Sequence, residues 1–317
     1  MNVLIVKTSS LGDIVHTLPA LTDAKKAIPD INFDWVVEEA FDEIPKWHPA
    51  VKNTLPITLR LWRKNLTRAL FSGKIPAFIK TLRQKKYDFI IDAQGLIKSS
   101  IIAKMARGER SGYDKNSIRE SQATVFYKNK FAVAKDQHAI TRIRQLFAAA
   151  LKYEMPTTAP DYGINKQIFP LPNSRENYIV FFHATSREEK CWHEQKWIEL
   201  AQFATANGFI VYLPWGNSTE LTRAKRITQN NNQAKVLPSL SLSAIAALLL
   251  NAKGAVAVDT GLGHVAAALD IPIISLYGPS DPNLCGTACA NQIHMTNFEQ
   301  LDAADVWQTI KKRIDHA

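Results

Sequence analysis

Cysteine is scarce in this 317-residue chain, and long apolar runs are missing from it. Its three cysteines, Cys191, Cys285 and Cys289, have no cysteine or histidine pair near them that would complete the four-ligand spacing of a zinc site, so we expect ordinary reduced thiols. No apolar stretch approaches the roughly 20 residues of a membrane-spanning helix, and the apolar residues 3–6 lack the flanks of a signal peptide. The sequence therefore predicts a cytoplasmic protein.

Several motifs of nucleotide and nucleic-acid chemistry are also missing. Without a G-x-x-x-x-G-K-S/T motif the chain is not expected to be a P-loop nucleotidase. It lacks an Asp-x-Asp pair, so the carboxylates that would hold Mg²⁺ on a nucleotide diphosphate have no candidate, and we expect no metal and no other cofactor. The glycine fingerprint of a nucleotide-sugar epimerase does not follow the first apolar run. No zinc finger, RNP motif or leucine zipper indicates a nucleic-acid partner.

Positive charge is concentrated in one part of the chain. Residues 51–150 contain 21 Lys and Arg but 6 Asp and Glu, a local excess of +15, whereas the whole chain carries +10. The remaining residues therefore sum to −5. A field of this kind attracts polyanions such as nucleic acid, anionic lipid or an acidic small molecule. A basic surface that only keeps the protein soluble would give the same count.

Short apolar runs alternate with amphipathic stretches from end to end, which is the pattern of parallel β-α-β units. A chain of this length suits two domains. We predict two Rossmann-like lobes, with strands at 3–6, 33–37 and 89–92 and helices at 14–28, 75–85 and 139–151 in the first, and strands at 178–182, 209–213, 255–258 and 273–276 in the second.

The segment between the lobes contains four prolines between positions 156 and 172 and has neither helical nor strand periodicity, which indicates a linker. The predicted domains are residues 1–155 and 178–317, and the predicted linker is 156–177. Two doubly wound domains joined in this way would face each other across a cleft at the carboxyl ends of their sheets, where ligands of α/β proteins bind. An interdomain site is therefore expected.

The first predicted strand is followed by a short polar, glycine-containing segment, residues 7–13, and then by a helix that begins near Ile14. Asp13 is thereby placed at a helix N-terminus. An aspartate there can simply cap the helix by accepting hydrogen bonds from free backbone N–H groups. Alternatively, a carboxylate that faces a bound hydroxyl in the cleft can remove its proton as a general base. The sequence leaves both interpretations open.

Two segments of the second lobe place polar side chains between a buried strand and a helix. Thr185, Ser186 and Lys190 follow the first strand of that lobe and suit phosphate contacts, although helix capping and a solvated run of charges would explain them equally well. Residues 258–264, VDTGLGH, lead into an alanine-rich helix, and their glycines allow a diphosphate to approach its N-terminus. With no metal expected, Lys190, His264 and backbone N–H groups would meet the diphosphate charge, unless His264 is structural.

These segments occur together in one known family. In combination they resemble the lipopolysaccharide heptosyltransferases of glycosyltransferase family nine, most closely the type I members, and the similarity runs over essentially the whole chain. The motifs that carry it are VKTSSLGD at 6–13, VVEE at 36–39, DAQG at 92–95, HATSREEK at 183–190, LPWG at 213–216, DTGLGH at 259–264 and YGPSDP at 277–282.

The resemblance implies a GT-B fold, with two Rossmann-like domains facing each other across an interdomain cleft, and an inverting, metal-independent glycosyltransferase. It would move L-glycero-D-manno-heptose from ADP-heptose to the first Kdo of Kdo₂-lipid A in the synthesis of the lipopolysaccharide inner core. Asp13 would be the general base, and Lys190 would contact the donor phosphates during catalysis.

The resemblance also assigns the other contacts to ADP-heptose. Glu220 would bind the ribose, Leu240 would line the adenine pocket, and the remaining residues would hold phosphates and heptose. Ser186 and Leu240 stand where the family has threonine and methionine, changes that keep a hydroxyl and an apolar contact. The complete set of donor contacts is Thr185, Ser186, Lys190, Glu220, Leu240, Asp259, Thr260, Gly261 and His264.

The acceptor that the resemblance implies carries carboxylates and phosphates, which gives the basic segment 51–150 a partner. It lies at the cytoplasmic face of the inner membrane, so we expect a monomer peripherally associated with anionic lipid. A sibling enzyme that adds the second heptose or a related sugar is an alternative that only donor and acceptor tests separate. The candidate acceptor contacts are Arg60, Arg63, Lys64, Lys98 and Arg119.

Overall fold

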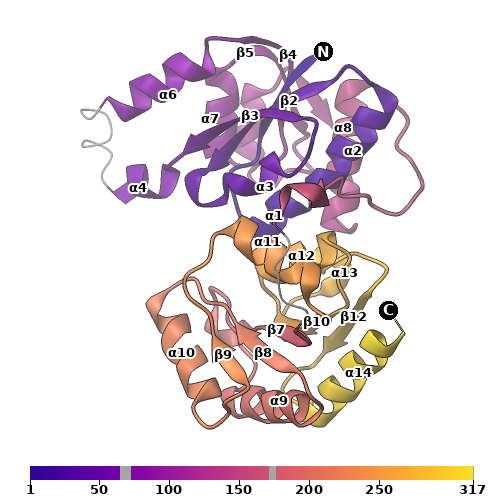
Figure 1. The fold of residues 1–317 in the computed structure, drawn as a ribbon. Coiled ribbons are helices and arrows are strands. Elements are labelled where there is room, and N and C mark those ends of the chain that lie inside the picture. Colours follow the sequence, from indigo (N-terminus) through magenta and orange to yellow (C-terminus); the bar gives the residue numbers. More distant parts are fainter. Residues whose placement is uncertain (65–72, 171–175, 317) are drawn as a thin grey trace. The chain divides into compact units, whose positions relative to one another are not determined.

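The computed structural model describes residues 1–64, 73–170 and 176–316 of the chain. The chain divides into two compact units, Met1–Asn165 and Lys166–Ala317. Each unit contains one six-stranded sheet whose strands are all parallel (Figure 1). The predicted α/β class with two Rossmann-like sheets is confirmed.

The sheet of the N-terminal unit has the strand order β3-β2-β1-β4-β5-β6. Its strands are β1 Asn2–Val6, β2 Asn32–Glu38, β3 Val51–Ile57, β4 Lys86–Asp92, β5 Arg107–Tyr113 and β6 Asn129–Phe131. The helices of this unit are α1 Leu11–Val15, α2 Leu18–Ala27, α3 Glu43–Lys46, α4 Leu59–Lys64, α6 Lys74–Leu82, α7 Ile97–Met105 and α8 Ala139–Leu151, with the 3₁₀ turns η1 Glu39–Phe41 and η2 Ser121–Phe126.

Helices cover both faces of this sheet, which explains why the central strand β1 is apolar on both sides. Its residues 3–6 are fully buried. Val6 packs in a cluster with Ile102 of α7, whereas on the other face the ring of Phe33 lies 6.2 Å from that of Phe147 in α8. Burial of each such side chain contributes about 1.5–3 kcal/mol to stability.

The prediction of one helix over residues 14–28 is wrong, because the structure has two helices, α1 and α2, in this stretch. Pro19 lies at the start of α2 and has no backbone N–H group to continue a preceding helix, but its fixed φ suits a first helical turn. The consequence for the site is that Asp13 is the third residue of the short α1, not a residue ahead of the helix.

Residues 156–165 are hydrogen-bonded to the rest of the N-terminal unit. The guanidinium of Arg144 pairs with Asp23 at 2.6 Å and also donates to the carbonyls of Pro156 and Thr158 at 3.2 and 3.0 Å. Because both partners of this ion pair are buried, removing either would leave a buried charge unpaired. The division between the units therefore falls after Asn165, within the segment predicted as the linker.

The sheet of the C-terminal unit has the order β12-β11-β10-β7-β8-β9. Its strands are β7 Tyr178–Phe182, β8 Ile210–Leu213, β9 Ala234–Val236, β10 Gly254–Val258, β11 Ile273–Tyr277 and β12 Gln292–Thr296. Its helices are α9 Glu194–Ala206, α10 Ser218–Thr228, α11 Leu242–Asn251, α12 Gly261–Ala268, α13 Pro282–Cys285 and α14 Ala303–Asp315, with the 3₁₀ turns η3 Lys166–Ile168 and η4 Glu188–Lys190.

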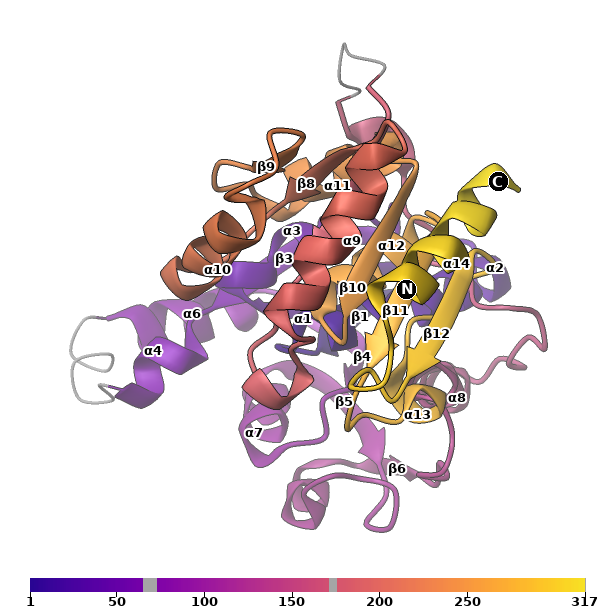
Figure 2. The ribbon, with the colours of Figure 1, turned by 90° about the horizontal axis from the view of Figure 1, so that it is seen from below.

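Helices also cover both faces of this second sheet. Figure 2 shows α9 and α14 side by side across one face, with α11 and α12 on the other. The hydrophobic core between α9 and the sheet contains Trp192 and Trp197, whose rings pack edge to face with their centroids 5.4 Å apart. Among the described residues, no helix combines the length and the apolar character needed to cross a bilayer.

The two sheets share one topology. When the strands of each unit are numbered from one, both sheets have the order 3-2-1-4-5-6, and the first and fourth strands lie side by side in the middle. From the first strand the chain adds strands toward one side of the sheet, and from the fourth strand it adds them toward the other side. The loops that follow these two strands therefore point away from each other, and ligands of such sheets bind between them. These switch points lie at the carboxyl ends of β1 and β4 in one unit and of β7 and β10 in the other, and we refer to them as the β1–β4 and β7–β10 crevices.

Candidate active site

Asp13 lies at the β1–β4 crevice and does cap its helix. One carboxylate oxygen, Oδ2, accepts hydrogen bonds from the backbone N–H and the hydroxyl of Ser10 at 2.9 and 2.6 Å. The other oxygen, Oδ1, lies 3.3 Å from the ammonium of Lys7. Since 42% of the Asp13 side chain is exposed, the cap leaves part of the carboxylate accessible. Capping and a chemical role are therefore compatible here.

The environment of Asp13 keeps it ionised. Burial would raise the pKa of the carboxyl group, but the Lys7 ammonium and the hydrogen bonds from Ser10 outweigh burial and hold the pKa of Asp13 well below its ordinary value. The side chain of Lys7 is itself only 6% exposed, and its ammonium also donates to the carbonyl of Ala93 at 3.1 Å. Asp13 is thus ready to accept a proton at neutral pH, although its low basicity makes orientation important.

The candidate acceptor contacts follow other strands of the same sheet. Lys98 is half-buried in the first turn of α7, after β4, and Arg119 is exposed between β5 and η2. Because the strands are parallel, both residues follow carboxyl ends at the sheet edge that carries Asp13. Arg60, Arg63 and Lys64 lie on α4, after β3, but their side chains lie outside the described part of the structure.

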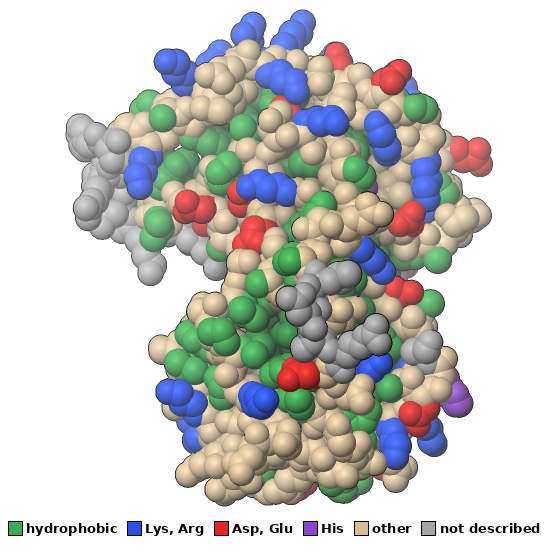
Figure 3. Space-filling view, in the orientation of Figure 1, with side chains coloured by type: hydrophobic (Ala, Val, Ile, Leu, Met, Phe, Trp, Pro, Cys, Tyr) green, Lys and Arg blue, Asp and Glu red, His purple; other side chains and the backbone are tan. Residues whose placement is uncertain are grey.

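The positive charge of the N-terminal unit does not form one continuous patch on the face seen in Figure 3. Lys and Arg side chains are spread over that face and interspersed with Asp and Glu. The part of this face that the structure describes is therefore not a uniformly basic surface.

In the C-terminal unit, Lys190 and Asp259 meet at the β7–β10 crevice. Their ammonium and carboxylate groups are 2.6 Å apart, with 19% and 11% of the two side chains exposed. Burial would raise the pKa of Asp259, but hydrogen bonds from Lys190 and Ser280 and the nearby His264 outweigh it and lower the pKa. The sequence placed both residues at the site but did not predict that they pair with each other.

The first turn of α12 lies beside this ion pair. Thr260 is the N-cap residue, Gly261 begins the helix, and His264 is buried within it. The side chain of Thr260 does not cap this turn, whereas the side chain of Asn217 caps α10 and that of Ser241 caps α11. Free N–H groups and the helix dipole together favour an anion at this position.

The other residues predicted to bind the sugar donor follow β7 and its neighbours β8 and β9. Thr185 and Ser186 lie between β7 and η4, half-buried and exposed respectively. Glu220, in the first turn of α10, accepts hydrogen bonds from the backbone N–H of Gly216 and the side-chain amide of Asn217, both at 2.7 Å. Leu240 follows β9 and helps to line a largely apolar pocket of about 430 Å³.

These positions form a row along the carboxyl edge of the sheet. The loops follow β10, β7, β8 and β9, which are neighbours in that order, so the row spans three strand spacings or about 14 Å. Charged groups stand at one end, at Lys190 and Asp259, and Leu240 stands at the other. The apolar pocket that Leu240 helps to line extends beside α11 as far as Tyr178, the first residue of β7. An elongated ligand with an anionic part and an apolar part matches this row.

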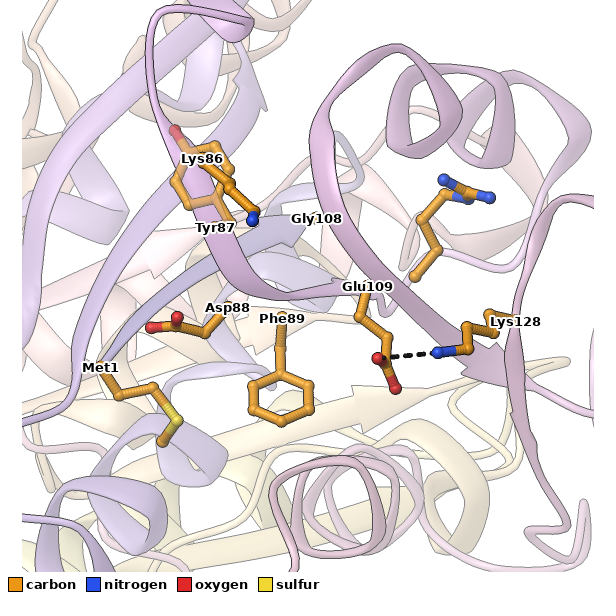
Figure 4. A pocket seen from close by; sticks show the side chains of 9 residues that line it. Met1, Lys86, Tyr87, Asp88, Phe89, Gly108, Glu109 and Lys128 are labelled. Atoms are coloured by element: carbon orange, nitrogen blue, oxygen red, sulfur yellow. Dashed lines mark hydrogen bonds and ion pairs between the residues drawn. The ribbon is translucent and has the colours of Figure 1, made fainter.

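A larger pocket, of about 870 Å³, lies elsewhere in the N-terminal unit (Figure 4). It is lined by Met1 and by residues 86–89 and 108–110, which belong to the amino ends of the strands, and its Glu109 pairs with Lys128. This is the sheet edge opposite to Asp13. Since ligands of doubly wound sheets bind at the carboxyl edge, we take the β1–β4 crevice of one unit and the β7–β10 crevice of the other as separate candidate sites.

Two further findings concern metals and thiols. Within residues 1–64, 73–170 and 176–316, no group of three or more His, Cys, Asp or Glu side chains is placed to hold a metal ion. All three cysteines are free thiols, as predicted.

The two doubly wound parallel sheets, with chemistry-bearing residues at both switch points, define a GT-B fold. Residues 75–312 match the family model of "Glycosyltransferase family 9 (heptosyltransferase)". The chain is 48% identical over 296 residues to lipopolysaccharide heptosyltransferase 1 of Pseudomonas aeruginosa, covering 93% of this chain and 83% of that protein.

Two solved structures of Escherichia coli heptosyltransferase WaaC, each 46% identical to this chain, are also similar. The one with ADP has a TM-score of 0.94 and covers 99% of this chain and 100% of that one. The one with ADP-2-deoxy-2-fluoro heptose has a TM-score of 0.91 and covers 98% and 99%. The chain belongs to glycosyltransferase family 9, the heptosyltransferases, and is therefore an enzyme of sugar transfer.

Some residues that shape the site were not predicted from the sequence. Lys7 pairs with Asp13, Gln94 binds the loop before α1, and Ser280 hydrogen-bonds Asp259. All three lie in motifs that carry the resemblance, but nothing in their spacing indicates a partner. Their contacts join loops that follow different strands, and such pairs leave no periodic pattern in a sequence.

Proposed function

We propose that the chain is an inverting glycosyltransferase that moves L-glycero-D-manno-heptose from ADP-heptose to the first Kdo of Kdo₂-lipid A, in the synthesis of the lipopolysaccharide inner core. The observation that carries the proposal is the position of Asp13 at one switch point and of the Lys190–Asp259 pair at the other. The donor is supported by the E. coli relative, whose structures hold ADP and ADP-2-deoxy-2-fluoro heptose.

The diphosphate of the donor would bind at the β7–β10 crevice. Lys190 supplies a cation there, and the uncapped first turn of α12 supplies N–H groups from Thr260 and Gly261. A bound phosphate would share the ammonium that Asp259 holds in the structure, and the Asp259 carboxylate would then accept hydroxyl groups of the heptose. Thr185, Ser186 and His264 would add contacts to phosphate and sugar.

The adenosine of the donor would lie over β8 and β9. Each carboxylate oxygen of Glu220 accepts one hydrogen bond within the protein and keeps a lone pair for a ribose hydroxyl. Leu240 and its pocket offer an apolar surface for the adenine ring. This assignment places base, ribose, diphosphate and heptose in sequence along the row of loops.

The reaction would be a single displacement. Asp13 would remove the proton of a Kdo hydroxyl while the hydroxyl oxygen bonds to the anomeric carbon of the heptose, and the bond from that carbon to the ADP oxygen would break on the opposite face. The configuration at the anomeric carbon inverts, and the proton ends on Asp13. Lys190 and the N–H groups of α12 would stabilise the negative charge that develops on the leaving phosphate without a metal ion.

The acceptor would bind the N-terminal unit through cations near Asp13. Lys98 and Arg119 follow strands of the same sheet and would contact carboxylates or phosphates of Kdo₂-lipid A, together with Arg60, Arg63 and Lys64 of α4. Since this acceptor is a lipid, we also propose that the protein works as a monomer, associated peripherally with the cytoplasmic face of the inner membrane. Raised salt concentration should then increase the KM for the acceptor more than the KM for the donor.

One assay tests the proposed function. The purified protein is incubated with ADP-heptose and Kdo₂-lipid A in the presence of EDTA, and the molecular mass of the lipid product is measured by mass spectrometry. We expect the mass of Kdo₂-lipid A to increase by one heptose, at a rate that EDTA does not change. A parallel reaction with an acceptor that already carries the first heptose is the control.

Two outcomes would overturn parts of this proposal. A product formed only from the heptosylated acceptor would identify a sibling transferase that adds the second heptose. A rate abolished by EDTA and restored by Mg²⁺ would contradict metal independence while leaving the sugar transfer in place.

A further inference from the structure

The loop that carries Asp13 is held by a side chain from the neighbouring strand. Gln94 follows β4, and its carbonyl oxygen Oε1 accepts the backbone N–H groups of Thr8 and Ser9 at 3.0 and 3.1 Å. Both bonds cross the β1–β4 crevice, 86 and 85 residues apart in sequence. They fix two consecutive peptide groups directly ahead of Ser10, the residue that hydrogen-bonds Asp13.

Gln94 is in turn fixed by a buried carboxylate. Asp92, the last residue of β4, is fully buried, and its Oδ1 accepts the backbone N–H groups of Gln94 and Gly95 at 2.9 and 3.1 Å. Its Oδ2 accepts the hydroxyls of Ser99 and Tyr127 at 2.8 and 2.6 Å. Four donors satisfy this carboxylate, so the turn after β4 has one defined conformation.

Lys7 links the same two loops through a second set of hydrogen bonds. Its ammonium joins the Ala93 carbonyl, at 3.1 Å, to Oδ1 of Asp13, at 3.3 Å. A continuous path of hydrogen bonds therefore runs from Tyr127 through Asp92 and Gln94 to the loop that holds Asp13, with Lys7 as a second link between the same two loops.

We propose that Lys7, Gln94 and the Asp92–Tyr127 pair are positioning residues for the transfer reaction, which act by fixing the Asp13 carboxylate toward the acceptor hydroxyl. The inference rests on the proposed function, in which Asp13 is the base. Because the environment of Asp13 gives it low basicity, its effectiveness depends on geometry, and displacement of a reacting group by about 1 Å can cost 10²-fold in rate.

The chain offers a matched control for this network. Tyr87 and Tyr127 are both buried tyrosines of the N-terminal unit, with 3% and 5% exposure, and each donates its hydroxyl to a buried aspartate. Tyr127 binds Asp92, at the carboxyl end of β4, but Tyr87 binds Asp34, which belongs to the amino half of β2. Loss of either hydroxyl removes a similar bond, but only one of the two belongs to the path to Asp13.

The experiment compares Gln94→Met, Tyr127→Phe and Tyr87→Phe in the full-length protein. We expect kcat to fall about 10- to 100-fold in Gln94→Met and about 3- to 10-fold in Tyr127→Phe, with the KM for ADP-heptose unchanged. Tyr87→Phe should keep the wild-type kcat even though its melting temperature falls as much as that of Tyr127→Phe. Amide hydrogen exchange at Thr8 and Ser9 should accelerate in the first two variants and not in the third.

A pH profile tests the part assigned to Lys7. Lys7→Met should raise the pKa of Asp13, so that kcat begins to fall at a higher pH on the acid side than in the wild type, and Lys7→Arg should restore much of the original profile. Equal loss of kcat in Tyr87→Phe and Tyr127→Phe, or wild-type kcat in Gln94→Met with faster exchange at Thr8 and Ser9, would overturn the positioning network. Full activity of a variant without Asp13 would instead overturn the proposed role of Asp13 as the base, while the sugar transfer itself would stand.

Discussion

Replacement of Asp13 by alanine should lower kcat about 10²- to 10⁴-fold while the affinity for ADP stays within about twofold of the wild type. Loss of a positioned general base has effects of this size, and the residues proposed for the donor all lie in the other unit of the chain. Steady-state kinetics of heptose transfer and calorimetric titration with ADP measure the two quantities.

Asparagine at position 13 separates the two roles of the carboxylate. Its carbonyl oxygen can still accept the hydrogen bonds from Ser10 and cap α1, but it cannot take a proton. Asp13→Asn should therefore keep most of the roughly 1 kcal/mol that a helix cap contributes to stability and lose as much kcat as the alanine variant. Near-wild-type turnover of the asparagine variant would leave Asp13 as a cap without a role in proton transfer.

Replacement of Lys190 by alanine should have the second-largest effect. It removes the cation proposed for the leaving phosphate and leaves the largely buried Asp259 without its ion-pair partner. We expect kcat to fall about 10²- to 10³-fold, as for loss of one electrostatic contact to a developing charge, and both the KM for ADP-heptose and the Kd for ADP to rise.

Lys253 provides the control for a lost positive charge, because it is exposed and precedes β10 at the amino edge of the same sheet. Lys253→Ala should have wild-type kinetics. An unchanged kcat and KM for ADP-heptose in Lys190→Ala would show that the ion pair with Asp259 only stabilises the fold.

The central strands of each sheet could be predicted from the sequence, but most of the edge strands could not. Strands such as β1, β7, β10 and β11 are apolar on both faces because helices cover both sides, so they appear as continuous apolar runs. The edge strands β3, β6, β9 and β12 are short or partly exposed and have no such run, and β5, RGERSGY, is polar through its first half.

The loops of the site were predicted because they follow those central strands. The polar segment 7–13 and the segment 258–264 each begin where a buried strand ends, and parallel strands bring such loops to one edge. Glu220 and Leu240 were proposed through the resemblance alone, since a glutamate in a first helical turn and a leucine in a loop carry no chemical signal of their own. In the structure Glu220 lies in the first turn of α10, after β8, and Leu240 lies in the loop after β9.

Contacts made by individual side chains could not be predicted in the same way. The side-chain carbonyl of Gln94 accepts the backbone N–H of Thr8, and the Lys190 ammonium donates to Asp259 across 69 residues of sequence. Such contacts depend on the register of neighbouring strands, which is fixed by the packing of the whole sheet and not by any local pattern. For Asp13 the sequence left capping and catalysis open, and the structure shows that the cap exists and still leaves an accessible carboxylate.

Hydrogen–deuterium exchange with and without ADP tests directly whether the donor binds at the β7–β10 crevice. ADP should slow the exchange of amides in residues 184–190 and 259–264, with no change in residues 86–89 and 107–110 around the pocket of Figure 4. Protection of that second set alone would place the nucleotide at the amino edge of the N-terminal sheet and contradict donor binding at the β7–β10 crevice.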